Sequence, residues 1–149
     1  MRHPPGRVQV AATLSIHARA ARAGGAAIEF ALVLPVFLAL LSGIVDFGWV
    51  FFQQTNLQAA VREGARMGAM TATTGTPDPR AVATLRVGAA LTEYSLNIDG
   101  GKVTAVYAGS SPNLLLSVSA TVPFRPLIGL TPTPETLNSS LTMLVEQQP

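Results

Sequence analysis

The sequence predicts an α+β protein in which a long N-terminal transmembrane helix continues into an extracytoplasmic helix and packs, with a second helix, against a small antiparallel sheet. Residues 30–52 carry a single charge, Asp46. As a helix these 23 residues would extend about 35 Å, against about 30 Å for the hydrocarbon of a bilayer. Residues 114–122 alternate apolar and polar side chains, as expected for a strand with one buried face. A sheet this small needs helices on one face to be stable.

The charges and the reactive residue types exclude several classes of function. Four of the ten basic residues precede Gly24, which leaves six basic residues against eight acidic ones from Gly25 onward. That balance argues against nucleic-acid binding, which needs a basic face on the folded part. The chain has no Cys, and both His residues, His3 and His17, precede Gly24. With no phosphate loop, metal-ligand cluster or paired carboxylates either, the sequence predicts no enzyme, no catalytic residue, no metal and no cofactor.

Residues 1–24 form a basic leader, and residues 25–52 form the membrane-spanning helix, which we expect to begin near Ala26. An ordinary secretory signal has its small-residue cleavage site after the apolar run. Here the pair Gly24-Gly25 precedes that run, so a cut there would occur on the cytoplasmic side and leave the helix attached. The Arg-rich leader and the uncharged outer flank place residues 1–24 in the cytoplasm and residues 53–149 outside it. We therefore expect a single-pass protein of the cytoplasmic (inner) membrane, in contact with lipid.

Three runs of residues resemble the TadE family of the tight-adherence (Tad/Flp) pilus system: residues 24–35 (GGAAIEFALVLP), 43–48 (GIVDFG) and 59–66 (AAVREGAR). The resemblance covers residues 19–70, about a third of the chain. It implies a pseudopilin-like fold and the function of a minor pseudopilin, a structural component required for assembly of a type IV pilus of the Tad/Flp type. The partners it implies are a prepilin-type peptidase, other Tad pilus subunits and assembly-platform proteins. It also implies incorporation into a pilus as one fate of the subunit.

The same resemblance assigns roles to the residues around the cleavage site. It places the cut between Gly24 and Gly25, and it implies that Glu29 and Phe30 act in processing and subunit pairing. In this interpretation the Glu29 carboxylate is recognised by the peptidase and pairs with the free amine of another subunit's mature N-terminus. The alternative is an interfacial carboxylate that only favours the helix dipole. A carboxylate costs about 2.5–3.5 kcal/mol at the bilayer centre but far less at its edge, so both interpretations place Glu29 at the edge.

Two further features of the helix suggest contacts. We expect Asp46 to be an interfacial or subunit-facing carboxylate rather than a proton relay, because no second titratable group lies within reach on this helix. In the continuation over residues 53–70, small residues recur at four-residue spacing, which allows close helix approach: Ala60, Gly64 and Gly68. This ridge packs either on the chain's own C-terminal domain or on another helix. A solvated face with one i,i+3 pair is expected from Arg62, Glu63 and Arg66.

The remainder is a linker, residues 71–79, and a small α+β domain, residues 80–149. Asp78 is expected to cap a second helix that begins at Pro79 and ends before a turn at residues 97–101. Three strands should follow, over residues 103–108, 114–122 and 137–145. The connection over residues 123–134 is rich in Pro and partly apolar, and we expect it across the sheet or against the membrane surface.

Two functions of different class are compatible with these features. One is the TadE-like minor pseudopilin. The other is a membrane-anchored extracytoplasmic domain that binds a ligand or a protein and keeps an uncleaved signal anchor. The spacing from Gly25 to Phe30 favours the first.

Overall fold

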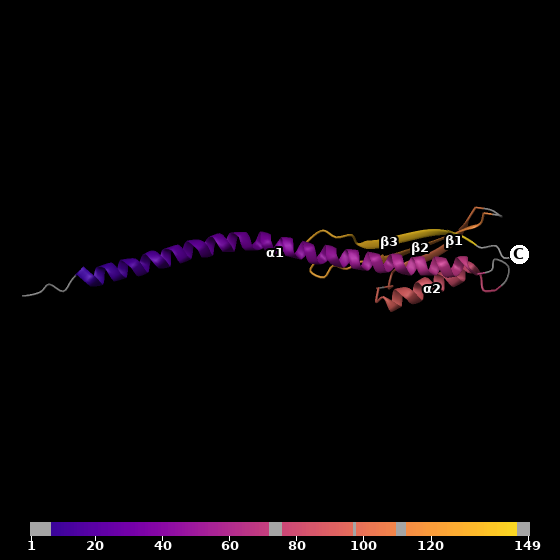
Figure 1. The fold of residues 1–149 in the computed structure, drawn as a ribbon, viewed down its shortest axis with the longest axis horizontal. Helices are drawn as coiled ribbons and strands as arrows, with labels where there is room; N and C mark the ends of the chain where they lie inside the picture. The colour runs from indigo at the N-terminus through magenta and orange to yellow at the C-terminus, as the bar shows by residue number, and fades with distance from the viewer. Residues whose placement is uncertain (1–6, 72–75, 97, 110–112, 146–149) are drawn as a thin grey trace, which may run out of the picture. The chain divides into compact units, whose positions relative to one another are not determined.

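The computed structural model of the protein describes residues 7–71, 76–96, 98–109 and 113–145, with side chains from Gly25 onward. Within these residues, two helices are followed by three strands, as Figure 1 shows: α1 (Arg7–Ala69), α2 (Pro79–Glu93), β1 (Lys102–Ala108), β2 (Leu115–Pro123) and β3 (Thr136–Leu144). The predicted α+β class is therefore confirmed. The chain forms two compact units, Met1–Leu41 and Ser42–Pro149, and α1 contributes to both.

The start of α1 differs from the expectation. We expected the helix to begin near Ala26, but it begins at Arg7 and runs without interruption through Gly24 and Gly25. The reason is local composition, because residues 7–34 contain no Pro and are rich in Ala, the residue with the highest helix propensity. Each glycine costs about 1 kcal/mol in a helix, and the flanking alanines offset part of that cost. Pro35 also lies inside α1.

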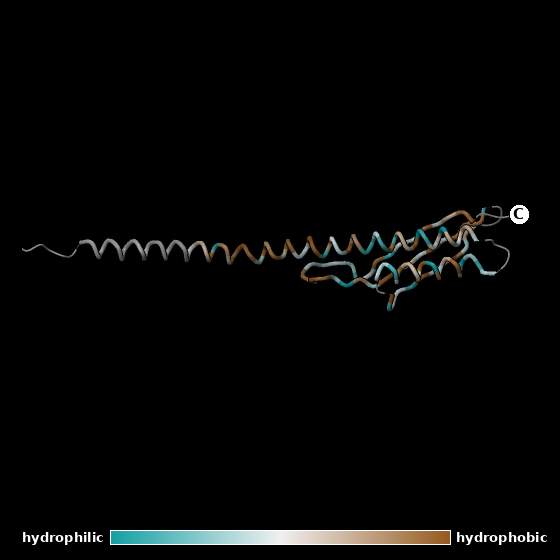
Figure 2. Tube along the Cα trace, turned by 60° about the horizontal axis from the view of Figure 1, so that its bottom comes forward, coloured by the Kyte–Doolittle hydropathy of each residue, from teal (hydrophilic) through white to brown (hydrophobic). Residues whose placement is uncertain are grey.

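The apolar part of α1 is largely not covered by other parts of its own chain. Among the described residues, α1 is the helix long and apolar enough to cross a membrane, over Gly25–Ala69, and only 6% of its most apolar window is buried. Figure 2 shows the N-terminal half of this stretch mostly in the colour of hydrophobic residues, whereas hydrophilic and hydrophobic residues alternate in the half beside α2. The core helix of a soluble protein would instead be covered by its own chain. A long apolar helix near the N-terminus fits a single-pass membrane anchor.

The sheet is an antiparallel meander with the order β1-β2-β3. Val118 at the centre of β2 lies opposite Ala105 of β1 and Leu141 of β3. Alternate residues of β2 are almost fully buried: Leu116, Val118, Ala120 and Val122. The alternation predicted from the sequence is therefore confirmed, and the bounds of each strand differ from those expected by about one residue.

One core joins the C-terminal part of α1 to α2 and the sheet. Each helix contributes fully buried residues at four-residue spacing, namely Leu57, Val61 and Ala65 from α1 and Ala83, Val87 and Leu91 from α2. This spacing keeps a single face of each helix towards the core. Of the linker and turn expected from the sequence, residues 72–75 and 97 lie outside the described residues.

Candidate functional sites along the long helix

The cleavage junction lies on an open surface of the unit Met1–Leu41. A Cβ atom added at Gly25 would meet no atom within 4 Å. Glu29 and Phe30 are both exposed, Phe30 to 65%. Among the described residues, Glu29 has no hydrogen-bond or ion-pair partner. The residues expected to act in processing and pairing are therefore accessible, on a backbone that is helical rather than extended.

The small-residue ridge packs against α2 of the same chain. A Cβ atom at Gly64 would overlap the Val87 side chain and come within 2.8 Å of the Ala83 carbonyl oxygen. At Gly68 it would come within 2.8 Å of the Pro79 carbonyl oxygen and 2.6 Å of Leu116 Cδ2. The two glycines thus let the backbones of α1 and α2 approach closely. Ala60 is fully buried in the same core. Of the two alternatives for the ridge, the structure shows the first: the ridge packs on the chain's own C-terminal domain.

A charged contact also links the two helices. Nε and Nη2 of Arg86 on α2 both donate to Oε1 of Glu63 on α1, and the Nε–Oε1 distance is 3.0 Å. Glu63 raises the pKa of Arg86, chiefly through these hydrogen bonds. The expectation of an i,i+3 pair within α1 is therefore wrong, because the guanidinium on α2 offers Glu63 two charged donors. Arg62 and Arg66 are exposed, as expected.

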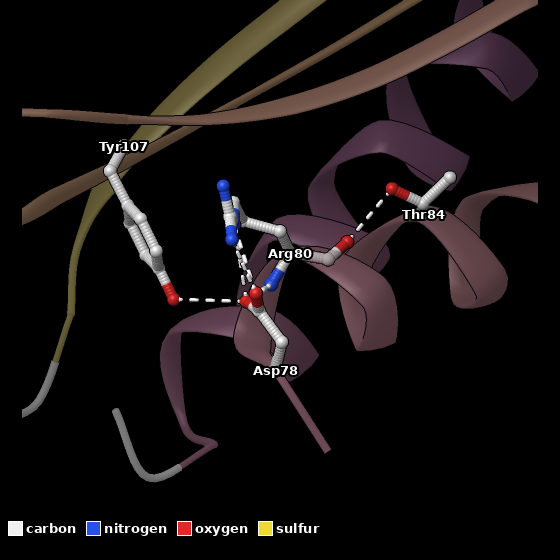
Figure 3. Close-up of polar contacts among 4 residues, drawn as sticks. All are labelled: Asp78, Arg80, Thr84 and Tyr107. Carbon is white, nitrogen blue, oxygen red and sulfur yellow. Dashed lines mark hydrogen bonds and ion pairs between the residues drawn. The ribbon is translucent and has the colours of Figure 1, made fainter. Parts of the chain in front are cut away.

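The start of α2 is tied to β1 through Asp78 (Figure 3). As predicted, Asp78 caps the helix: its Oδ1 accepts from the Arg80 backbone N–H at 2.8 Å. Its carboxylate also pairs with the Arg80 guanidinium, 2.6 Å from Nη2 to Oδ2, and accepts from the Tyr107 hydroxyl at 3.2 Å. The Arg80 guanidinium lies 5.0 Å from the centre of the Tyr107 ring, a cation–π contact.

These contacts shift the ionisation of the cluster. Hydrogen bonds from the Arg80 side chain and then from its backbone N–H lower the pKa of Asp78 to about 2. Burial and then the hydrogen bond to Asp78 raise the pKa of Tyr107. Since Arg80 and Asp78 are both partly exposed and already satisfy each other, the cluster joins α2 to the sheet. The sequence predicted the cap, but it carried no signal for the contact with Tyr107.

Asp46 is fully buried within the unit Ser42–Pro149. Its carboxylate accepts from the backbone N–H groups of Ile128 at 2.8 Å and Gly129 at 3.0 Å, and from the Thr131 hydroxyl at 3.4 Å. We expected an interfacial or subunit-facing carboxylate. The connection between β2 and β3 of the same chain covers Asp46, so it does not face another subunit, and its position at the membrane interface stays a prediction. The signal available in the sequence was that a charge within an apolar helix needs a partner.

A polar groove lies between the C-terminal part of α1 and β3. Its lining consists mainly of side chains that donate or accept hydrogen bonds, with Leu141 beside them: Gln54, Gln58, Arg62, Asn138, Ser139 and Ser140. The Gln54 amide donates to the Asn138 carbonyl across it at 2.9 Å. Within the described part of the chain, no group of three His, Cys, Asp or Glu residues could hold a metal ion.

Comparison with models of protein families shows which of these features lie in a segment that matches a known family. Residues 24–66 match the family model described as TadE-like protein. The resemblance predicted from the three sequence runs is confirmed over this segment. No curated protein and no solved structure matches the chain significantly.

The TadE-like segment contains most of the features described above. It begins at Gly24 and includes Glu29, Phe30, Asp46, Ala60 and Gly64. In the unit Ser42–Pro149, its part of α1 packs against α2 and the sheet through Leu57 and Val61. The matched segment thus includes both the apolar stretch of α1 and the part of α1 that packs in the core with α2 and the sheet. This match associates the chain with Tad pili, as a membrane protein.

Proposed function

We propose that the chain is a TadE-like minor pseudopilin, a membrane-anchored structural component required for assembly of a Tad/Flp-type pilus. The observation that carries the proposal is the family match over residues 24–66, which starts at the glycine pair and includes the exposed apolar helix. A structural role agrees with the two ion pairs of the described residues: Glu63 with Arg86 links α1 to α2, and Asp78 with Arg80 lies at the start of α2. The partners under this proposal are a prepilin-type peptidase and other Tad pilus components.

Processing between Gly24 and Gly25 is part of the proposal. A peptidase needs access to the scissile bond, and Gly25 is exposed, with no atom within 4 Å of a Cβ placed there. The helical backbone there would have to unwind. Two adjacent glycines make unwinding less costly, because glycine has the lowest helix propensity of any residue except Pro. Removal of residues 1–24 would eliminate four Arg residues and create a new amine at Gly25. The exposed Glu29 would then be the fifth residue of the mature chain.

Pairing between that amine and Glu29 of another subunit would neutralise two charges at the membrane edge, next to the hydrocarbon into which an unpaired charge is costly to move. The open position of Glu29 supports this role. The matched control is Glu93, an exposed carboxylate on α2 outside the TadE-like segment. Glu29→Ala and Glu29→Gln should both abolish pilus assembly even where cleavage survives, whereas Glu93→Ala should leave assembly unchanged. Normal assembly with Glu29→Gln would contradict a role for the charge.

The decisive experiment is an intact-mass measurement on protein from native membranes. We expect a mature chain that begins at Gly25, and the full precursor mass for Gly24→Ile. Native protein that retains its leader while pili assemble normally would contradict the processing proposal. It would favour the alternative, a membrane-anchored binding domain with an uncleaved anchor, for which the polar groove beside β3 is the candidate surface.

Orientation in the membrane is tested separately. The positive-inside rule predicts that residues 1–24 lie in the cytoplasm and that the unit with the sheet lies outside it. A reporter fused after Pro149 should be active only if it is of a kind that works outside the cytoplasm. Activity of a strictly cytoplasmic reporter at that position would exclude the proposed topology.

A further inference from the structure

The connection between β2 and β3, residues 124–135, exposes three large aliphatic side chains within four residues. Leu127, Ile128 and Leu130 are 60%, 50% and 70% exposed. Isolated exposed aliphatic residues are common on proteins, but a cluster of them marks a contact surface. Residues 126–134 carry no charge. This segment, which we call the apolar loop, is therefore suited to an apolar environment.

The apolar loop is held in place by Asp46. The carboxylate accepts the successive N–H groups of Ile128 and Gly129, and Thr131 adds its hydroxyl. Gly129 has φ = 76°, a conformation that glycine adopts without strain and that lets neighbouring N–H groups converge on one anion. Figure 1 shows the connection beside α1. The aliphatic side chains are thus presented on a loop anchored to the helix at three points.

The surface of α1 on both sides of Asp46 is apolar as well. Ile44, Val45 and Phe47 are exposed, and they belong to the stretch of α1 that is apolar enough to cross a membrane. The apolar loop therefore extends the lipid-compatible surface of α1 to a second segment of the chain. The carboxylate between them is kept from lipid, where it would be costly, by the N–H groups of the loop.

We propose that the apolar loop is a second membrane contact, which inserts Leu127, Ile128 and Leu130 into the outer lipid interface while Asp46 positions it. The two charged residues of the connection, Arg125 and Glu135, lie outside the uncharged stretch, where lipid headgroups or water would solvate them. The occupant of this surface is lipid, because the surface continues that of the apolar anchor. The inference goes beyond the proposed pilus function and concerns the subunit while it is in the membrane.

The test uses spin labels on the full-length chain reconstituted in vesicles of phosphatidylcholine and phosphatidylglycerol. Because the chain has no Cys, Leu127→Cys and Leu130→Cys each provide a single labelling site. We expect collisions with oxygen, which partitions into lipid, to exceed those with a water-soluble nickel chelate several-fold. The control is Leu85→Cys on α2, 75% exposed, where the chelate should dominate. Equal ratios at the loop and at Leu85 would overturn the proposal.

Two further outcomes separate lipid from other occupants and test the role of Asp46. The spectra of the Leu130 labels could instead broaden one another at every ratio of lipid to protein, with little access for either reagent. That result would show that a second copy covers the loop and would overturn the proposal. Asp46→Asn should increase the mobility of the Leu130 label and lower its oxygen preference, with no change at Leu85. An unchanged Leu130 label in Asp46→Asn would overturn the positioning role of Asp46. These outcomes do not depend on pilus assembly, so the inference and the proposed function fail independently.

Discussion

Gly64 is the position at which the packing of α1 on α2 can be tested most directly. In the substitution Gly64→Ala, the new methyl group would overlap the Val87 side chain and lie 2.8 Å from the Ala83 carbonyl oxygen. Val87 could move by changing its rotamer, but the carbonyl belongs to the backbone of α2. The two helices must therefore separate, or α2 must shift along the sheet, to accommodate a single methyl group.

The expected magnitude follows from two opposed effects. Alanine normally stabilises a helix interior by about 1 kcal/mol relative to glycine. Overpacking of a core costs about 1–3 kcal/mol, and the backbone contact at Gly64 places the cost in the upper part of that range. Gly64→Ala should therefore lower the free energy of unfolding by about 1–2 kcal/mol. Gly88 on α2 is the matched control, because a Cβ atom there meets nothing within 4 Å, and Gly88→Ala should stabilise by up to about 1 kcal/mol.

The assay is urea unfolding of the full-length protein in nanodiscs, followed by the fluorescence of Trp49. This is the single Trp of the chain, and it is partly buried against the core, so its emission reports the unfolding of the unit with the sheet. The two variants should differ by about 1–3 kcal/mol in extrapolated stability. If Gly64→Ala were as stable as Gly88→Ala, the close approach of the helices would be refuted.

Two other predictions concern the sheet and the cap of α2. Val118→Asp places an unpaired carboxylate in a small core and should cost several kcal/mol, enough to unfold a marginally stable domain. Thr121→Asp, at an exposed position of β2, should keep wild-type protease resistance. Equal sensitivity of the two variants to protease would contradict the strand register. The lowered pKa of Asp78, about 2 against about 3.9 when unfolded, contributes stability that is present above about pH 4 and is lost as the pH falls towards 2. Asp78→Asn keeps a capping acceptor and should reduce the slope of Tm against pH in that window, and an unchanged slope would argue against the Asp78–Arg80 pair.

Several parts of the structure could be predicted from the sequence because their causes are local. The apolar character of α1, the alternation along β2 and the cap at Asp78 each depend on residues that are neighbours in the chain. The glycine pair and Glu29 were recognisable for the same reason, since their spacing is read along a single segment. The start of α1 lies earlier in the chain than the expected start near Ala26, because the leader is rich in Ala and has a high helix propensity although it lacks a hydrophobic period.

By itself, the sequence determined the secondary structure of α2 and the sheet, the apolar character of α1 and the match to the TadE-like family over residues 24–66. Only the tertiary structure decided the partners of the charged groups and of the small-residue ridge. Asp46 accepts from a residue 82 positions away, and Glu63 pairs with Arg86, 23 positions away. Local periodicity specifies which face of an element is apolar, but the partner of a single polar group depends on how distant elements are brought together, and no pattern within one element contains that information.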